Sequence, residues 1–327
     1  MSKILITGAA GFIASNTCEA LLKKGYDIVG IDNFCDFYDI NLKNKNIEIV
    51  EKVAKDTGRS FNLIKGDIRD KELINKIFKE NDFIGCIHFA AMAGVRPSIE
   101  NPDYYVDVNI NGLMNVLNGL IDSNCKKFIF ISSSSVYGNN KKVPFSEKDN
   151  VDNPISPYAA TKKAGELICY TYHNLFNIDI NCLRYFTVYG PRQRPDLAIN
   201  KFTRLLLEGK HIPMFGDGTT ARDYTFIDDI VDGTIKSFEY LQENNNIYDI
   251  FNLGGSNPIS LKDLIQVIGK AVGVTPVVDE LPMQKGDVNI TYSDYSHAKE
   301  ILHYEPKIRI EEGVSRFVDW YKKETGK

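Results

Sequence analysis

The sequence lacks an excess of basic residues, a long apolar run and a charged N-terminal segment. Its 39 Lys and Arg stand against 43 Asp and Glu, a net charge of -4, which excludes a strongly basic nucleic-acid-binding protein. The longest apolar stretch, residues 83–95, contains His88 and two glycines and falls short of the roughly 18 to 20 residues that span a bilayer, so no membrane span is expected. Because an apolar run opens at Ile4 without a charged leader, we expect a cytoplasmic protein.

Cysteine and histidine are also few, and they are scattered. The six cysteines lie far apart, in neither metal-ligand nor redox-pair spacing, and mostly inside apolar runs. The five histidines form no close pair. The sequence therefore predicts reduced thiols in the core and no metal site, so other residues must carry the chemistry.

The first part of the chain alternates short β-branched runs with longer helical patterns. Apolar runs separated by helices are typical of a parallel sheet that is covered on both faces. The sequence therefore predicts an α/β fold, a doubly wound parallel sheet of the Rossmann type. Strands are expected at residues 4–7, 28–32, 61–64, 83–89, 128–132 and 180–185, and helices at 12–24, 102–122 and 157–176.

After Tyr185 the pattern changes to short segments separated by Gly and Pro, with helices expected near 260–272 and 310–323. We therefore expect a Rossmann domain over residues 1–185 and a smaller second domain over 186–327. Residues 250–253 have the pattern of a strand that returns to the first sheet, so the first domain is expected to receive 223–254 as well.

A glycine pair lies between the first predicted strand and the first predicted helix. Gly8 and Gly11 can form a tight turn that lets the backbone approach a pyrophosphate at the helix N-terminus, although Ala14 replaces the third glycine of the usual pattern. Asp32 ends the second strand 24 residues after Gly8, where a carboxylate can bond ribose hydroxyls and repel a 2′-phosphate. These residues favour NAD over NADP. Asp67, after the third strand, can reach the adenine edge or simply cap the next helix.

Tyr158 and Lys162 lie four residues apart on the helix predicted after Pro157, so both side chains emerge on one face. An ammonium within about 4 to 6 Å stabilises a phenolate, so Tyr158 could act as a base near neutral pH. The run Ser132–Ser135 ends the fifth strand, at the edge where open α/β sheets bind ligands. A serine run is by default a polar loop, but these hydroxyls are also placed to bond a sugar.

Together these residues resemble the extended short-chain dehydrogenase/reductase family over nearly the whole chain. Three longer strings, residues 92–96, 184–196 and 283–288, most resemble the UDP-glucuronate 4-epimerase branch of that family. The resemblance implies an isomerase that interconverts UDP-glucuronate and UDP-galacturonate through a transient 4-keto intermediate with tightly bound NAD. The family features that carry it are Gly8, Gly11, Asp32, Asn109, Ser133, Tyr158 and Lys162.

Carried over residue by residue, the resemblance assigns three catalytic side chains. Tyr158 is expected to be the base, Lys162 its electrostatic partner and a ligand of the nicotinamide ribose, and Ser133 the hydrogen-bond partner of the reacting hydroxyl. The expected cofactor contacts are Gly8, Gly11, Phe12, Ile13, Asp32, Asn33, Asp67, Ile68, Ala90, Lys162 and Tyr185.

The resemblance also implies a UDP-sugar site. Arg222 is expected to clamp the pyrophosphate, with Phe215 and Asp287 beside the uridine and ribose. A substrate carboxylate must be desolvated in a closed site and needs fixed donors, which the chain concentrates near Arg194 and Thr187. Arg194 could instead form a rim ion pair with Asp196. The residues expected to bind substrate are Arg96, Ser134, Ser135, Thr187, Arg194, Phe215, Arg222 and Asp287.

Three other functions stay open at this point. A 4-epimerase of a neutral UDP-hexose or UDP-N-acetylhexosamine is the close competitor, although those enzymes commonly have Asn where this chain has Thr187. A non-catalytic NAD-binding sensor would need the glycine turn but not Tyr158 and Lys162. A dehydratase or uronate decarboxylase would place an acid in the segment that here reads Ser133–Ser135.

The family pairs two of its helices with those of a second copy, so the resemblance also implies a homodimer. Support in the sequence comes from apolar stripes on the helices near 102–123 and 156–176, which could alternatively cover the chain's own sheet. The stripes comprise Leu113, Leu117, Leu120, Leu167, Ile168 and Tyr172.

Overall fold

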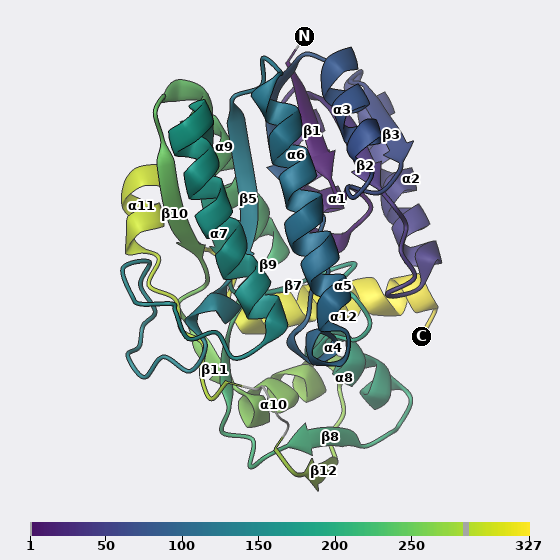
Figure 1. The fold of residues 1–327 in the computed structure, drawn as a ribbon. Helices are drawn as coiled ribbons and strands as arrows, with labels where there is room; N and C mark the ends of the chain where they lie inside the picture. The colour runs from purple at the N-terminus through teal and green to yellow at the C-terminus, as the bar shows by residue number, and fades with distance from the viewer. Residues whose placement is uncertain (1, 284–287) are drawn as a thin grey trace.

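The computed structural model describes residues 2–283 and 288–327, and its centre is a seven-stranded parallel sheet. The strand order is β10-β6-β5-β4-β1-β2-β3, so the chain reverses direction across the sheet between β1 and β4. This confirms the predicted α/β fold with a doubly wound parallel sheet (Figure 1). The strands are β1 (Lys3–Thr7), β2 (Asp27–Asp32), β3 (Phe61–Lys65), β4 (Phe83–His88), β5 (Lys127–Ser133), β6 (Asp179–Tyr185) and β10 (Tyr248–Leu253).

Helices cover both faces of this sheet because successive strand residues point to opposite sides. On β1, Ile4 and Ile6 pack with the core that includes α1, while Leu5 packs with the core that includes α6. One face is covered by α1 (Phe12–Lys23), α2 (Ile40–Thr57) and α9 (Ile227–Glu243). The other is covered by α3 (Lys71–Glu80), α6 (Gly112–Ile121) and α7 (Pro157–Phe176), with α6 and α7 side by side in Figure 1.

A smaller region with two further sheets lies at the carboxyl ends of the central strands, below the main sheet in Figure 1. One sheet joins β7 (Thr187–Tyr189), β9 (Ala221–Phe226) and β11 (Pro258–Ser260); the other joins β8 (Ile212–Phe215) and β12 (Val278–Leu281). Its helices include α8 (Ala198–Leu207), α10 (Leu261–Val272) and α12 (Ile310–Thr325), while α11 (Ser296–Leu302) packs near β10. Between β9 and β11 the chain returns to the central sheet through α9 and β10.

The helix expected over 102–122 is formed by three consecutive segments. These are α5 (Pro102–Val106), a π-helical turn at Asp107–Asn111, and α6, with the short α4 (Val95–Glu100) just before them. Helices α2, α3 and α9 were not predicted. α2 and α9 both carry start signals that were not used for prediction: Asp39 caps α2 by accepting the Asn41 N–H, and Asp228 and Asp229 lie in the first turn of α9, which follows β9 directly.

Within the described part of the chain, no helix combines the length and the apolar character that a membrane crossing requires.

Candidate active site

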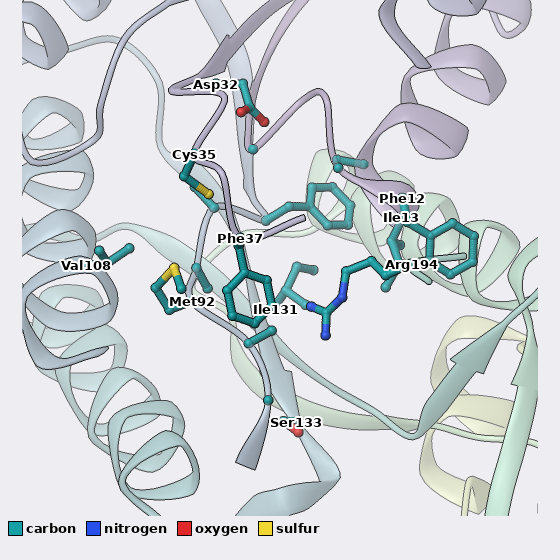
Figure 2. Close-up of a pocket in the computed structure, with 18 of the residues that line it drawn as sticks. Phe12, Ile13, Asp32, Cys35, Phe37, Met92, Val108, Ile131, Ser133 and Arg194 are labelled. Carbon is teal, nitrogen blue, oxygen red and sulfur yellow. The ribbon is translucent and has the colours of Figure 1, made fainter. Parts of the chain in front are cut away.

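A cavity of about 370 Å³ opens at the carboxyl ends of the central strands, where the strand order reverses. Figure 2 shows side chains from several separate loops converging on it. It brings together most of the predicted site residues, although they come from widely separated parts of the sequence. The predicted residues that line it are Gly8, Gly11, Phe12, Ile13, Asp32, Asn33, Asp67, Ile68, Ala90, Ser133, Tyr158, Lys162, Tyr185, Thr187 and Arg194.

The glycine turn brings the backbone of β1 against that of the β4 loop. Gly8 has a φ of +70°, and a Cβ there would lie 2.8 Å from the backbone nitrogen of Ala90, so a side chain would both strain and clash. Gly11 donates its N–H to the Gly8 carbonyl at 2.9 Å and precedes α1 without a side-chain cap. The start of α1 therefore has the open backbone donors that suit a pyrophosphate.

Asp32 lies at the end of β2 and is largely buried. One carboxylate oxygen accepts the Ala10 N–H at 3.0 Å and the other accepts the Phe34 N–H at 2.8 Å, which fixes the group at the cavity edge. Lys43 of α2 lies 4.0 Å from Asp32 and donates to the Cys35 carbonyl at 2.8 Å. Lys43 was not anticipated because α2 was not predicted. These groups fit the adenosine ribose of a dinucleotide.

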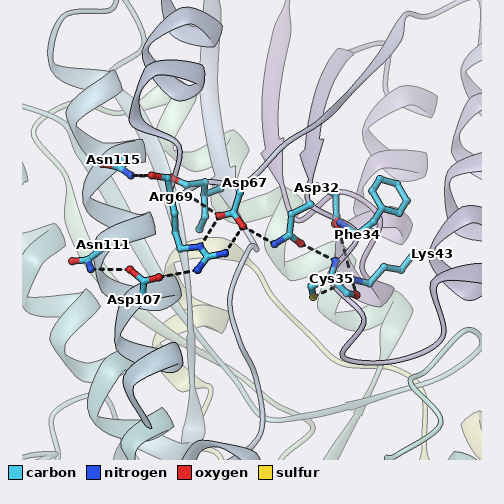
Figure 3. Close-up of polar contacts among 11 residues, drawn as sticks. Asp32, Phe34, Cys35, Lys43, Asp67, Arg69, Asp107, Asn111 and Asn115 are labelled. Carbon is cyan, nitrogen blue, oxygen red and sulfur yellow. Dashed lines mark hydrogen bonds and ion pairs between the residues drawn. The ribbon is translucent and has the colours of Figure 1, made fainter. Parts of the chain in front are cut away.

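Asp67, just after β3, lines the cavity and takes part in a polar cluster (Figure 3). Arg69 donates to both of its oxygens, with the Nε–Oδ1 and Nη–Oδ2 distances at 3.0 and 2.8 Å. The Asn33 side-chain amide donates to Asp67 at 2.9 Å, and Arg69 also bonds Asp107 at 2.8 Å. Hydrogen bonding from Arg69 lowers the pKa of Asp67 to about 2. Sequence reasoning missed Arg69, whose signal was only its position two residues after Asp67.

Helix α7 presents Tyr158 and Lys162 to the same cavity. Its start is defined by the Ser156 hydroxyl, which accepts the Ala159 N–H at 3.2 Å, and by Pro157 at the first position. Lys162 is buried and donates to the Ile131 carbonyl at 2.7 Å. Burial lowers the pKa of Lys162 to about 8.

The environment of Tyr158 works in both directions on its acidity. Burial raises the pKa of Tyr158, while a hydrogen bond from Ser133 and the positive charge of Arg194 lower it. The spacing of Tyr158 and Lys162 predicts that the stabilising positive charge comes from Lys162, whereas here the positive charge that lowers the pKa of Tyr158 is that of Arg194. Ser133 is held in place because its hydroxyl accepts the Ser135 N–H at 3.1 Å. Both Ser133 and Arg194 therefore favour the charged form of Tyr158, against the effect of burial.

A second, smaller cavity of about 120 Å³ adjoins the first, and Thr187 lines both. Ser134, Ser135 and Arg222 line it as well, which places these predicted substrate residues together. Arg222 donates to the Ala221 carbonyl at 2.9 Å.

Arg96 and Phe215, two further predicted substrate residues, lie outside these two linings. Arg96 packs its guanidinium over the Phe215 ring, 5.6 Å from the ring centroid, so the two residues meet each other. Asp287 lies outside the described residues.

Arg194 has two neighbours at the cavity mouth. It forms a two-bond ion pair with Asp196, and its guanidinium lies 5.1 Å from the centroid of the Phe37 ring. Figure 2 shows the Arg194 guanidinium beside the Phe37 ring, with Ser133 below them in the view. Arg194 thus joins the loop after β7 to the loop after β2.

Comparison with known proteins gives concordant results. The sequence profile of the family described as GDP-mannose 4,6-dehydratase matches residues 5–317. A UDP-glucuronate 4-epimerase of Thermodesulfobacterium geofontis is 45% identical over 323 residues, which cover 98% of this chain and 97% of the relative.

Two solved structures share the fold. The UDP-glucuronic acid 4-epimerase of Bacillus cereus, in complex with UDP-glucuronic acid and NAD, is 38% identical with a TM-score of 0.91, covering 98% of this chain and 99% of that one. The UDP-glucose 4-epimerase of Thermotoga maritima with UDP-glucose is 32% identical with a TM-score of 0.88, covering 99% of both chains.

Proposed function

We propose a function for this chain from the premise that it belongs to the GDP-mannose 4,6-dehydratase family of extended short-chain dehydrogenases/reductases. Within that family it is a UDP-glucuronate 4-epimerase, which interconverts UDP-glucuronate and UDP-galacturonate with tightly bound NAD. The observation that carries this function is the single cavity that combines the glycine turn and Asp32 with Ser133, Tyr158 and Lys162. The Bacillus cereus and Thermodesulfobacterium geofontis enzymes support the choice.

NAD bound in the main cavity would accept hydride from carbon 4 of the sugar and return it to the opposite face. Gly8, Gly11 and the start of α1 would hold its pyrophosphate, and Asp32 its adenosine ribose. Asn33, Asp67 and the other predicted contacts complete this cofactor site.

The protein's own residues manage the proton and the orientation of the sugar. Tyr158 takes the proton of the 4-hydroxyl and later returns it, while Ser133 hydrogen-bonds the same oxygen and keeps it beside Tyr158. Lys162 bonds the nicotinamide ribose. Arg222 grips the pyrophosphate as a planar fork, so the 4-keto sugar can turn over while its nucleotide stays in place.

The uronate is distinguished from a neutral sugar by its carboxylate. Oxidation at carbon 4 makes a β-keto acid, which loses carbon dioxide readily when the breaking bond aligns with the carbonyl π system. Thr187, Ser134 and Ser135 would hold the carboxylate so that this bond lies near the carbonyl plane, where the developing carbanion gains little conjugation. Arg194 supplies the charge that desolvation of the carboxylate requires. We assign Arg96 to the sugar and Phe215 to the uridine, while Asp287, also expected beside the uridine, is outside the described residues.

One observation favours a second candidate, a 4-epimerase of a neutral UDP-hexose. Arg194 is paired with Asp196 in this structure, so its charge is partly satisfied without a substrate carboxylate. The Thermotoga maritima UDP-glucose 4-epimerase shares the fold over nearly the whole chain.

A panel of UDP-sugars tests the two candidates directly. The purified protein is incubated with UDP-glucuronate, UDP-glucose and UDP-N-acetylglucosamine, and gluco and galacto products are resolved by NMR. We expect UDP-galacturonate from UDP-glucuronate at the highest turnover. Equal or faster turnover of UDP-glucose would overturn the uronate assignment.

We further propose that the protein divides into an NAD-binding domain over 1–185, with 223–254, and a substrate domain over 186–327.

We propose a cytoplasmic location, supported by six cysteines that are all free thiols.

We also propose a homodimer. Leu113, Leu117 and Leu120 are fully buried against the chain's own core and so do not supply its interface. Its support is the exposed apolar surface of α7, where Leu167 is 55% and Tyr170 52% exposed. Light scattering that gives a stable monomer at micromolar concentration would refute it.

A further inference from the structure

Beneath the catalytic residues lies a fully buried ion pair between α7 and β6. Glu166 and Arg184 are each 1% exposed, and two hydrogen bonds join them, both 2.8 Å long. A buried pair is tolerated when its remaining polar groups also find partners. Ser132 donates to Glu166 at 2.7 Å, and Arg184 donates to the Tyr137 hydroxyl at 3.0 Å. The pair therefore joins one helix to two strands and to the segment that follows β5.

Each member of this cluster is close to a predicted site residue, either along the chain or on the same helix. Ser132 precedes Ser133, and Arg184 precedes Tyr185, with Ser132 and Arg184 in register on neighbouring strands. Glu166 is one helical turn after Lys162 and on the same face. Tyr137 belongs to the short helix that carries Ser134 and Ser135. A shift at any member would therefore move a residue of the active site.

The cluster is also held by hydrogen bonds to β10. The Tyr137 hydroxyl donates to the Asn252 side-chain oxygen at 2.7 Å, and the Asn252 amide donates to the Phe145 carbonyl at 2.9 Å. The Arg184 guanidinium lies 4.9 Å from the Tyr137 ring centroid. β10 thus supports the far side of the network, so the cluster has little freedom to shift.

We propose that Glu166 and Arg184, with Ser132 and Tyr137, are positioning residues for the reaction. They hold α7 in a fixed register against β5 and β6 and so set the place of Tyr158 and Lys162 relative to Ser133. The assignment rests on the proposed epimerase function for its main readout. Stability alone does not explain why the chain buries this ion pair, since apolar side chains of the same size often stabilise a core at least as well.

The same two strands supply a matched control at their other end. Lys127 at the start of β5 bonds Asp179 at the start of β6 at 2.8 Å, and both side chains are largely buried. Lys127 also donates to the Asn244 carbonyl at 2.6 Å, far along the strands from the cavity. Lys127→Met therefore removes a comparable ion pair between β5 and β6 without contacting the site.

The test compares Ser132→Ala, Tyr137→Phe and Glu166→Gln with Lys127→Met. Turnover is measured per NAD-loaded molecule, together with KM and the melting temperature, on the UDP-sugar that the wild type converts fastest. We expect kcat to fall about 10-fold in Ser132→Ala and about 100-fold in Glu166→Gln, because small misplacements of reacting groups are costly, with KM changed less than threefold. Lys127→Met should lower the melting temperature and leave kcat within twofold.

A pH profile adds a readout that a purely structural role would not move. The charged or titratable groups that act on Lys162 are Glu166 and Cys169 of α7, while His88 of β4 faces it from the sheet. The Glu166 anion raises the pKa of Lys162, so Glu166→Gln should shift the alkaline limb of kcat to lower pH.

Unchanged kcat in Ser132→Ala and Tyr137→Phe, with only a lower melting temperature, would overturn the proposal, and these two variants decide it if Glu166→Gln fails to fold. If the wild type converts no UDP-sugar, the proposed function fails separately. Hydrogen exchange then decides the positioning role. Faster exchange over residues 157–166 in Ser132→Ala, but not in Lys127→Met, supports it, and equal exchange in the two variants overturns it.

Discussion

Arg194 bonds the Asp196 carboxylate through two parallel hydrogen bonds, 3.0 Å from Nε to Oδ1 and 2.8 Å from an Nη to Oδ2. This two-bond geometry is the one that a guanidinium would offer to the carboxylate of a uronate. Asp196 is half exposed, whereas the Arg194 side chain is only 17% exposed and contributes to the cavity lining. With Arg194 in the role we propose, Asp196 would compete with the substrate carboxylate for the same cation.

Asp196→Asn should strengthen binding of the uronate. The amide keeps the size of the side chain but removes the competing negative charge, so KM for UDP-glucuronate should fall by about 3- to 10-fold. KM for UDP-glucose should stay within twofold because that sugar has no carboxylate. Steady-state kinetics on both sugars check this, and an equal change in the two KM values would contradict the role given to Arg194.

Arg194→Ala should slow epimerisation of the uronate and raise the share of decarboxylated pentose product.

Tyr158→Phe should lower kcat by about 10³-fold, because only the acid-base group is lost and the ring packs as before. NAD content should stay near the wild-type value, since the pyrophosphate and adenosine contacts that we propose lie on the β1 and β2 loops. Turnover by NMR and NAD release on denaturation are the measurements. A fully active variant would end the assignment of Tyr158.

Lys162 should give the protein opposite pH trends in activity and stability. Its pKa is lowered from the ordinary value of 10.5 to about 8, so the folded protein loses this proton above pH 8 while the unfolded chain keeps it to about 10.5. The folded state binds fewer protons in that window, so the contribution of Lys162 to stability rises between pH 8 and 10.5. Activity should fall over the same range as the ammonium is lost.

The Lys162→Met variant isolates this effect. Between pH 8 and 10.5 the melting temperature of the wild type should rise relative to that of the variant. The variant should also lack the alkaline limb of the activity profile. A constant difference in melting temperature would show that the Lys162 pKa is not lowered by burial.

The sequence predicted the central sheet well because most of its strands are rich in apolar and β-branched residues and are separated by helical patterns. It also predicted that residues at the ends of strands, such as Asp32 and Ser133, meet at one edge of the sheet, because parallel strands bring their carboxyl ends together. Both inferences need only local pattern and general topology. The cavity then collects these residues from remote parts of the chain.

Residues that depend on helix packing were not predictable in the same way. Lys43 reaches the Asp32 region from α2, where it lies on the buried face of the helix one turn before Ile47, and its sequence position gives no sign of this contact. The partnership of Glu166 with Arg184 joins residues from a helix and the following strand, and nothing in either segment says that the two charges meet. Long-range pairing of this kind becomes visible only when the elements are placed in space.

The ion pair between Asp67 and Arg69 should make the stability of the protein depend on pH in the acid range. The pKa of Asp67 is lowered to about 2 by Arg69, against an ordinary value of 3.8, so its stabilising contribution is present above about pH 4 and is lost as the pH falls through 2. Asp67→Asn should therefore destabilise the protein at neutral pH but hardly at pH 2. Asp107→Asn is the matched control, because Asp107 bonds the same Arg69 and is 45% exposed, where an ion pair contributes only about 0 to 1 kcal/mol.

Chemical denaturation from pH 2 to 7 measures both variants. The stability gap between wild type and Asp67→Asn should close as the pH falls, while the gap for Asp107→Asn should be small throughout. NAD affinity at pH 7 should fall in Asp67→Asn more than in Asp107→Asn, because only Asp67 lines the cavity. Equal gaps for the two variants would mean that Arg69 does not single out Asp67, and the anchoring of the adenine side would then have to lie in Asn33 or in the Ile68 backbone.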